Sequence, residues 1–429
     1  MLNKTIFAPI TAIGGSVTGI RISGAKALDV LHLISRKNIN IKHKQAQPVN
    51  IFDENGSHLD YAVVLFFKSP NSFTGEDVVE IFLHSSPYVV QKVLEILSSY
   101  ENVFYAQNGE FSRQAFLNGK LDIVQAEGIN SLVNSITQEQ HKLSLMMMEG
   151  RVSNFYKTLK SRFIKILSIM EINIDFSDEE IPERDSLFIR SEVSEILAQL
   201  SEYIENEKTI DRIFSGVKVS IIGKPNVGKS SMLNYLAKSD VAIVYDKPGT
   251  TRDIVSTDIK IKGNLVRLFD TAGIRETDDE IEKIGVQKSF ESYKNSDFSI
   301  IVQTKDEPYT GEIKPDDILI TNKIDFSGKS DGIGLSIKTK EGLEEFMSVL
   351  EARVKKFTQY KSNPVCMNQR HLAFLKNVYE ILNIFDYNNN IEIQYELIRQ
   401  GIVNIENIIG KIAHDEILDN VFANFCIGK

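Results

Sequence analysis

A glycine-rich phosphate loop constrains the fold of this chain more than any other feature. The loop spans Gly223–Ser230, and its sequence Gly-Lys-Pro-Asn-Val-Gly-Lys-Ser fits the pattern G-x-x-x-x-G-K-S. The strand-like run Val217–Ile222 precedes it, and the helix-compatible residues Ser231–Lys238 follow it, which is the context that such a loop requires. Glycines let successive backbone N–H groups converge on phosphates. The sequence therefore predicts a nucleotide-binding domain rather than a glycine-rich turn with an exposed lysine.

Four further segments follow this loop in the order of a GTP-binding domain. They are Gly249–Asp253 (GTTRD), Asp270–Gly273 (DTAG), Asn322–Asp325 (NKID) and Ser336–Lys338 (SIK). The strand-like runs that precede them are Val241–Val244, Leu265–Phe269, Ile318–Thr321 and Ile333–Leu335. A carboxylate at Asp325 accepts two hydrogen bonds from guanine, and adenine lacks that pair of donors. The five motifs together predict GTP as the bound nucleotide.

Several residues in these motifs have an expected role at the phosphates. We expect Lys229 to contact the terminal phosphates and the Ser230 hydroxyl to bind Mg²⁺. We choose Thr251 as the second hydroxyl on Mg²⁺, although the residue pattern alone does not separate it from its neighbour. Asp270 is expected to hold Mg²⁺ through water, and the backbone N–H of Gly273 to reach the γ-phosphate. The predicted GTP contacts are Asn226, Val227, Gly228, Lys229, Ser230, Ser231, Thr250, Thr251, Asp270, Thr271, Ala272, Gly273, Asn322, Lys323, Asp325, Ser336, Ile337 and Lys338.

The group that orients the attacking water is not evident from these motifs. Small GTPases such as Ras carry a glutamine after the D-x-x-G glycine, whereas this chain has Ile274 there, which cannot orient water. The next residues, 275–283, are rich in carboxylates. One of them acts through a bridging water, or the segment is only an acidic switch loop. Asn226 also has two interpretations, as a ligand of a monovalent cation or as a residue that braces the loop.

The hydrophobic pattern divides the chain into three predicted parts. Its 429 residues correspond to roughly two to four domains. Residues 1–118 alternate strand and helix patterns, which indicates a mixed α/β domain. Residues 119–213 and 356–429 show apolar residues at helical spacing and predict one helical domain. Residues 214–355 alternate short strands with helices, as a parallel α/β domain does. We therefore expect a multi-domain fold in which a Ras-like P-loop domain is inserted into a helical domain.

Composition limits the compartment and the partners. The net charge of −9 argues against a protein that coats nucleic acid without specificity. The basic segment 151–165 is a solvated helix face or a local nucleic-acid surface. No apolar run approaches the roughly 20 residues that span a bilayer, and we expect no signal peptide. The two cysteines, Cys366 and Cys426, lie far apart in sequence, so we expect a cytoplasmic protein without disulfides.

Three stretches outside the nucleotide motifs narrow the identity. They are Asn71–Asp77 (NSFTGED), Gly109–Asp122 (GEFSRQAFLNGKLD) and the terminus Phe425–Lys429 (FCIGK). With these stretches the chain closely resembles the MnmE (TrmE) family of tRNA-modification GTPases over essentially its whole length. The phosphate loop and GTTRD motif also occur in ribosome-assembly GTPases such as Era and Der, but the terminal CIGK and the N-terminal motifs do not.

The resemblance implies a reaction and a set of partners. The family works with an FAD-dependent protein as a hetero-oligomer to add an aminomethyl-type (carboxymethylaminomethyl) group at C5 of the wobble uridine in certain tRNAs. It implies 5,10-methylenetetrahydrofolate or 5-formyltetrahydrofolate as ligand, and an N-terminal domain, residues 1–118, that binds folate and makes a homodimer. By motif, the folate contacts correspond to Arg21, Glu80, Lys120 and Lys429. Cations suit the glutamyl carboxylates of folate, and a carboxylate suits its ring N–H groups.

The resemblance also bears on catalysis. Glu282 matches the family's glutamate that orients the catalytic water through another water, in the pattern Glu280-x-Glu282-x-x-Gly285. The family's potassium-dependent mechanism corresponds to a site at Asn226, Tyr245, Lys247 and Thr250. The chain departs from the family in this loop, because Tyr245-Asp246-Lys247-Pro248 replaces residues that are usually small or apolar. Cys426 matches the family's terminal cysteine, with either a chemical role or a role in shaping the pocket.

Two other hypotheses remain beside the tRNA-modification enzyme. A nucleotide-gated factor in ribosome assembly would bind rRNA and show no affinity for folate. The motif residues at the expected folate site argue against this hypothesis. A one-carbon enzyme with a merely regulatory GTPase is the other hypothesis, and the sequence does not separate it from the first.

Overall fold

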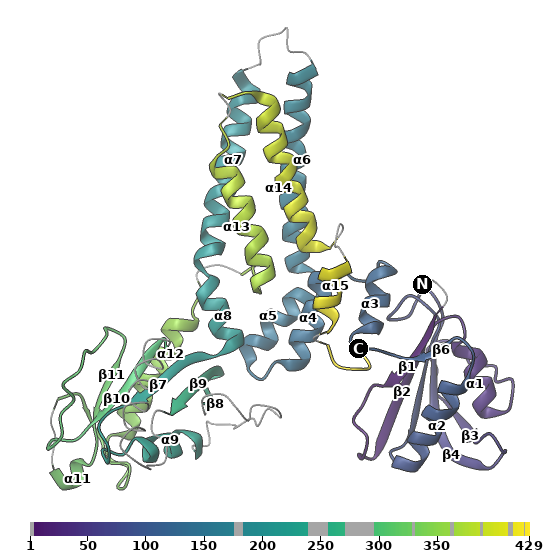
Figure 1. The fold of residues 1–429 in the computed structure, drawn as a ribbon, viewed down its shortest axis with the longest axis horizontal. Coiled ribbons are helices and arrows are strands. Elements are labelled where there is room, and N and C mark those ends of the chain that lie inside the picture. The colour runs from purple at the N-terminus through teal and green to yellow at the C-terminus, as the bar shows by residue number, and fades with distance from the viewer. Residues whose placement is uncertain are drawn as a thin grey trace, which may run out of the picture. The chain divides into compact units, whose positions relative to one another are not determined.

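The computed structural model describes residues 4–175, 183–238, 256–270, 296–327, 331–360, 364–386, 389–410, 415–423 and 425–429 (Figure 1). The chain forms two compact units. The first unit comprises Met1–Val133, Met146–Ser161 and Ile402–Lys429, and the second comprises Asn134–Leu145 and Arg162–Gly401. Each unit holds one sheet, and each is described by itself below.

A six-stranded sheet organises the first unit. Its strands are β1 (Thr5–Pro9), β2 (Val17–Ser23), β3 (Gln47–Phe52), β4 (His58–Phe67), β5 (Val78–His84) and β6 (Val103–Tyr105). Their order is β3-β4-β5-β2-β1-β6, and all neighbours are antiparallel except β1 and β6. The alternation of side chains sets which face is buried. In β4, Ala62 and Val64 are buried, whereas Tyr61 and Val63 are exposed.

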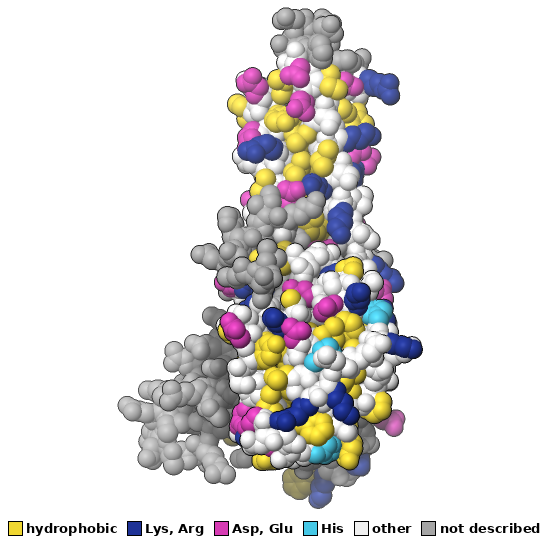
Figure 2. Space-filling view, turned by 90° about the vertical axis from the view of Figure 1, so that its right-hand side faces the viewer, with side chains coloured by type: hydrophobic (Ala, Val, Ile, Leu, Met, Phe, Trp, Pro, Cys, Tyr) yellow, Lys and Arg dark blue, Asp and Glu magenta, His cyan; other side chains and the backbone are white. Residues whose placement is uncertain are grey.

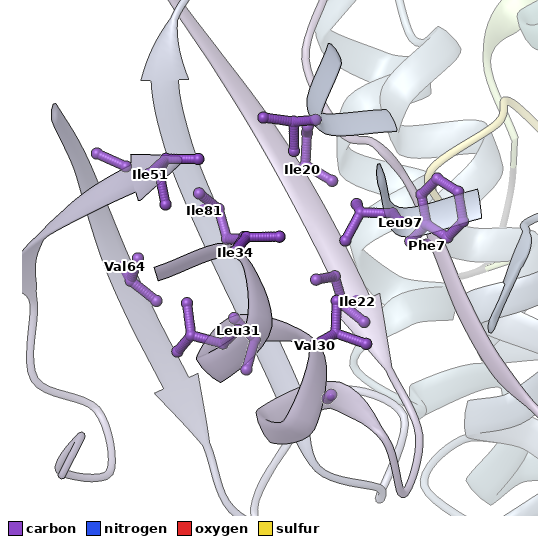
Figure 3. Close-up of a cluster of buried hydrophobic side chains, with 14 of the residues drawn as sticks. Phe7, Ile20, Ile22, Val30, Leu31, Ile34, Ile51, Val64, Ile81 and Leu97 are labelled. Atoms are coloured by element: carbon purple, nitrogen blue, oxygen red, sulfur yellow. The ribbon is translucent and has the colours of Figure 1, made fainter. Parts of the chain in front are cut away.

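Two helices cover one face of this sheet and create its core. They are α1 (Ala27–Ser35) and α2 (Pro87–Ser99). Figure 3 shows side chains of α1 packed between those of the strands, and fully burying one such aliphatic group contributes about 1.5–3 kcal/mol. Ile20 and Ile22 of β2 belong to this core. Because side chains alternate along a strand, Arg21 projects from the opposite face of the sheet.

Between residues 119 and 213, every element that the structure describes is a helix, as the sequence predicts. The helices of both units outside the sheets are α3 (Glu110–Leu117), α4 (Ile123–Asn134), α5 (Gln138–Met148), α6 (Arg151–Asp175), α7 (Glu183–Glu205), α8 (Glu207–Ser215), α13 (Gln369–Asn383), α14 (Ile391–Ile409) and α15 (Asp415–Ala423). The helical spacing of apolar residues predicted for this region is seen in α6, where Phe163, Ile166 and Met170 are fully buried. Phe425 lies beyond the end of α15 yet packs with Phe422 in one cluster.

A second six-stranded sheet carries the phosphate loop. Its strands are β7 (Val217–Ile222), β8 (Ser256–Ile261), β9 (Asn264–Asp270), β10 (Phe298–Gln303), β11 (Ile318–Thr321) and β12 (Ile333–Gly334). Its helices are α9 (Lys229–Lys238), α11 (Ile324–Ser327) and α12 (Leu343–Thr358). The order is β12-β11-β10-β7-β9-β8, and only the pair β8 and β9 is antiparallel. Every residue of β10 is buried, as expected of a central parallel strand.

The predicted fold class is confirmed, with a mixed α/β part, a helical part and an inserted parallel α/β part. The strands predicted before the phosphate loop and before the DTAG, NKID and SIK motifs are present as β7, β9, β11 and β12. Within residues 1–118, the helices α1 and α3 and the strands β3 and β6 were not predicted. The strand predicted at Val241–Val244 lies outside the described residues.

Candidate functional sites

The phosphate loop follows the central strand β7 of the second sheet. Because β7 lies between β10 and β9 and runs parallel to both, its carboxyl end lies at the same edge of the sheet as theirs. Glycine is required at both ends of the loop. Gly223 has a φ of 152° and a Cβ there would lie 2.1 Å from the carbonyl oxygen of Val302. Gly228 has a φ of 104°, and its Cβ would lie 2.2 Å from Nδ2 of Asn322.

The start of α9 places a cation and two hydroxyls at this loop. Nζ of Lys229 donates hydrogen bonds to the carbonyl oxygens of Gly223, at 2.9 Å, and of Lys224, at 2.8 Å. These contacts hold the ammonium over the loop, where the backbone N–H groups at the start of a helix favour an anion. Ser230 and Ser231 are exposed in the first turn of α9. An exposed hydroxyl at Ser230 fits a Mg²⁺ ligand beside bound phosphates.

Asn322 joins the phosphate loop to the two predicted base-binding loops. Its buried side chain donates from Nδ2 to the carbonyl oxygen of Val227 at 2.9 Å. Its Oδ1 accepts from the backbone N–H of Ile337 at 3.5 Å. Nζ of Lys323 donates to the carbonyl oxygen of Asn226 at 2.7 Å. The structure therefore brings together segments that are about 100 residues apart in sequence, as parallel strand ends do.

The other residues predicted to contact the base belong to α11 and to the 336–338 loop. Asp325 is exposed on the short helix α11, where its carboxylate is open to a ligand. Ser336 is almost fully buried, and its Oγ accepts from the backbone N–H of Thr339 at 3.2 Å. Lys338 is exposed. The exposed carboxylate of Asp325 is therefore accessible to a bound base beside these two loops.

Several predicted residues lie outside the described part of the chain. They are Tyr245, Lys247, Thr250, Thr251, Thr271, Ala272, Gly273 and Glu282. The backbone of Asp270 ends β9, next to β7, but its side chain is likewise outside the description. The roles predicted for these residues stay predictions.

A second cluster lies on the open face of the first sheet. Arg21 of β2 and Glu80 of β5 are direct cross-strand partners. Nε and a terminal nitrogen of Arg21 each lie 2.9 Å from Oε1 of Glu80, and both side chains are largely buried. The guanidinium also lies over the rings of Phe73, at 5.4 Å, and Phe111, at 5.5 Å. Aromatic faces stabilise a cation and hold it in one orientation.

The C-terminal residues contribute to the same cluster. Gly428 has a φ of 91°, and a Cβ there would lie 2.3 Å from the carbonyl oxygen of Pro9, so this terminus packs against β1 rather than fraying. Burial lowers the pKa of Lys429, Cys426 opposes that shift, and the nearby charge of Arg21 reinforces it. Cys426 is exposed. The structure thus places Arg21 and Lys429 close enough for their charges to interact.

Lys120 and the loop before β5 complete the cluster. Nζ of Lys120 donates to the carbonyl oxygen of Pro70 at 2.9 Å, and its side chain runs past Gly75. Glu76 lies in the same loop and contacts the buried hydroxyl of Ser23 at 3.3 Å. No role was predicted for Glu76, although it lies within the motif NSFTGED. Three cations, two carboxylates and two aromatic rings fit an anionic ligand with ring N–H groups.

The basic segment of α6 does not present a row of unneutralised charges. Ion pairs join Arg151 to Glu149, Lys157 to Asp122, Lys160 to Glu406 and Arg162 to Glu192, and Lys165 lies over the ring of Phe188. Figure 2 shows basic and acidic side chains intermingled over the helices at the top of that view. These contacts favour the solvated helix face over a nucleic-acid surface.

None of the described helices is long and apolar enough to cross a membrane. In the same part of the chain, no group of three or more His, Cys, Asp or Glu side chains is arranged to hold a metal ion.

The parallel sheet, the phosphate loop after β7 and the N-K-x-D loop bound to it define a P-loop protein of the GTPase class. Two family models cover nearly the whole chain. The MnmE helical domain matches residues 123–426, and the GTP-binding protein TrmE N-terminus matches residues 5–120. The chain belongs to the MnmE family.

Curated relatives agree with this assignment over their full length. The chain is 36% identical over 445 residues to the tRNA modification GTPase MnmE of Rickettsia canadensis, with 99% of this chain and 100% of that protein covered. It is 36% identical over 455 residues to the protein of the same name from Fervidobacterium nodosum, covering 100% and 98%. Among solved structures, the G domain of the T. maritima FeoB iron transporter matches 33% of this chain and 99% of that chain at 26% identity. The TM-score of that match is 0.24.

Proposed function

We propose that this chain is a GTPase that uses GTP hydrolysis to modify tRNA. The GTPase activity rests on the phosphate loop and on family membership. The observation that carries it is the position of Asn322, whose side chain binds the phosphate loop on one side and the 336–338 loop on the other. A nucleotide bound along this junction has its phosphates at α9 and its base at Asp325. The relatives' names supply the tRNA substrate.

The hydrolytic site requires residues from five segments. Backbone N–H groups of residues 226–231 bind the phosphates, and Lys229 neutralises the terminal ones. Ser230 and Thr251 would hold Mg²⁺, with Asp270 acting through water, and the metal would neutralise charge on the phosphate oxygens. Asn226, Tyr245, Lys247 and Thr250 would hold K⁺, a fixed positive charge beside the phosphates. We assign the positioning of the attacking water to Glu282, because Ile274 lacks any polar group.

The first unit holds the one-carbon ligand in this proposal. Arg21, Lys120 and Lys429 pair with its carboxylates, and Glu80 accepts hydrogen bonds from its ring. The ligand is 5,10-methylenetetrahydrofolate or 5-formyltetrahydrofolate. The proposed product carries a carboxymethylaminomethyl group at C5 of the wobble uridine, made together with an FAD-dependent partner protein.

The organisation of the chain follows from these assignments. We assign residues 1–118 to folate binding and homodimer formation, residues 119–213 and 356–429 to a helical domain, and residues 214–355 to the GTPase domain. The proposed compartment is the cytoplasm, where tRNA, GTP and K⁺ are available together.

Hydrolysis of GTP by the full-length protein tests the catalytic assignment. Glu282→Ala should bind GTP as the wild type does but hydrolyse it at least about 100-fold more slowly, because only the water is misplaced. Asp325→Ala is the control, since it should weaken binding of GTP and leave affinity for ATP unchanged. Unchanged turnover in Glu282→Ala would remove Glu282 from the mechanism. Equal affinity for GTP and ATP in the wild type would contradict a GTPase.

A further inference from the structure

The buried amide of Gln303 lies beside the segment that carries the N-K-x-D motif. Gln303 is the last residue of β10, which lies between β7 and β11 in the second sheet, and it is only 4% exposed. Burial of an amide is costly unless its donors and its acceptor find partners. The groups that this side chain binds therefore indicate why an amide is present at the end of the strand.

The amide of Gln303 binds this segment where the chain returns to the sheet. Its Nε2 donates hydrogen bonds to the carbonyl oxygen of Asp331 and to Oγ1 of Thr321, both at 3.1 Å. Oγ1 of Thr321 in turn donates to the same carbonyl oxygen at 2.5 Å. The next residue, Gly332, has a φ of 84°, and a Cβ there would lie 2.5 Å from the carbonyl oxygen of Leu319. The returning chain is therefore packed closely against the end of β11.

The main chain of Gln303 binds the same segment where it leaves the sheet. Its carbonyl oxygen accepts a hydrogen bond of 2.8 Å from the backbone N–H of Asn322, the first residue of the N-K-x-D motif. Its Oε1 accepts from the backbone N–H of Tyr309 at 2.9 Å, which fixes the loop after β10. Gln303 thus joins the departure of the segment at Asn322 to its return at Asp331. Asp325 lies between these two points in the chain, on α11.

Packing alone does not call for an amide at this position. Ile301 lies two residues earlier on the same face of β10, and it packs in an apolar cluster with Ile222 and Leu319. An apolar side chain at position 303 would continue this cluster without the cost of removing an amide from water. The hydrogen bonds that Gln303 makes to the neighbouring segment offset that cost.

We propose that Gln303 is a positioning residue for guanine recognition, and that its amide fixes the orientation in which Asp325 meets the base. This assignment rests on the guanine site of the proposed function. A carboxylate that accepts two parallel hydrogen bonds must be held in one orientation. Asp325 is exposed on a helix of only four residues, so packing around its own side chain does not hold it. The bonds from Gln303 to both ends of the segment supply that constraint.

The test compares GTP with inosine triphosphate, which lacks only the exocyclic 2-amino group of guanine. Displacement of a fluorescent GDP analogue from the full-length protein gives the dissociation constant of each nucleotide. The wild type should prefer GTP by about 10-fold or more, because inosine triphosphate leaves Asp325 with one hydrogen bond instead of two. Gln303→Met keeps the length of the side chain but none of its hydrogen bonds. It should lower the preference to less than about threefold, mainly by weakening the binding of GTP.

Gln140→Met is the matched control. Gln140 is also a buried amide of the second unit, and its Nε2 donates to the carbonyl oxygen of Ile213 at 2.9 Å, before the start of β7. The control loses the same kind of hydrogen bonds at the opposite end of that strand from the phosphate loop, so the preference for GTP should stay at the wild-type value. Thr321→Val is a second variant, which keeps the volume of the side chain and removes the hydroxyl bound to Gln303 and Asp331. It decides the question if Gln303→Met does not fold, since a lowered preference supports the inference and an unchanged one overturns it.

The outcomes separate this inference from the proposed function. Asp325→Ala should abolish the preference for GTP over inosine triphosphate. If it does so while Gln303→Met keeps the wild-type preference, only the inference is overturned. An equal loss of affinity for both nucleotides in Gln303→Met also overturns it, because that result shows a merely structural role. If the wild type has no preference, or Asp325→Ala retains it, the proposed guanine site and the inference fall together.

Discussion

The candidate nucleotide site and the proposed ligand site of the first unit are built in different ways. The nucleotide site consists of short continuous loops at the ends of neighbouring parallel strands, and much of its chemistry comes from backbone groups at Gly223–Ser230. The ligand site instead consists of side chains from β2, β5, the loop before β5, the residues after α3 and the C-terminus. A parallel sheet brings its loops together by topology alone. The ligand site depends on packing between distant segments, so its residues carry no recognisable spacing.

Because the nucleotide site is built from closely packed backbone, adding one methyl group there should reduce nucleotide affinity and stability the most. Gly223→Ala places a Cβ 2.1 Å from the backbone carbonyl of Val302 in a left-handed conformation. We expect nucleotide affinity to fall by at least about 100-fold and the second unit to lose about 1–3 kcal/mol of stability. Binding of a fluorescent GDP analogue and thermal unfolding measure both effects.

Gly263→Ala is the control for this experiment. It has a φ of 79° but nothing within 4 Å of the added Cβ, so only the cost of its conformation, about 1 kcal/mol, is expected. Equal effects of the two substitutions would show that the close approach at the phosphate loop is unimportant.

In the first unit, where side chains build the proposed site, removal of one side chain should reduce both stability and ligand affinity. Arg21→Ala leaves Glu80 without its cation in a largely buried position. We expect about 1–3 kcal/mol of lost stability and at least a 10-fold loss of affinity for 5-formyltetrahydrofolate, with GTP affinity unchanged. Lys26→Ala removes the exposed ion pair with Asp29 and should change neither quantity measurably. Retained folate affinity in Arg21→Ala would remove the guanidinium from the ligand site.

A smaller effect is expected from the protonation of Lys429. Burial and the charge of Arg21 lower the pKa of this lysine, against the opposing influence of Cys426. Only the charged ammonium pairs with a ligand carboxylate, so affinity should fall as the pH rises through this lowered pKa, earlier than for an ordinary lysine. Lys429→Arg keeps its charge at all accessible pH values and should remove the alkaline loss. An identical alkaline profile in both proteins would assign the loss to another group.

The two regions also differ in how far the sequence predicts them. The loops at Gly223, Asn322 and Ser336 were located from motif order, and β7, β9, β11 and β12 lie where the strands before the motifs were expected. The strand β3 was missed because Pro48 and Asn50 interrupt its apolar pattern, and only two of its residues, Val49 and Ile51, are buried.

The limits at the ligand site have a physical cause. Only the resemblance to a family predicted the residues Arg21, Glu80, Lys120 and Lys429. They come from segments that are distant in sequence, and strand pairing and the packed C-terminus bring Arg21, Glu80 and Lys429 together. Glu76 was not predicted as a site residue because its surroundings depend on burial and on Asn118, which follows α3 and is distant in sequence. Local sequence carries no signal for either condition.

Nucleoside mass spectrometry of bulk tRNA from cells depleted of this protein tests the central claim most directly. The account predicts loss of C5-aminomethyl-type wobble uridines, restored by the wild-type chain but not by Asp270→Ala, which cannot hold Mg²⁺ through water at the phosphates. An unchanged nucleoside profile would contradict the role in tRNA modification and favour a GTPase that acts in ribosome assembly. Full rescue by Asp270→Ala would show that the modification does not need GTP hydrolysis.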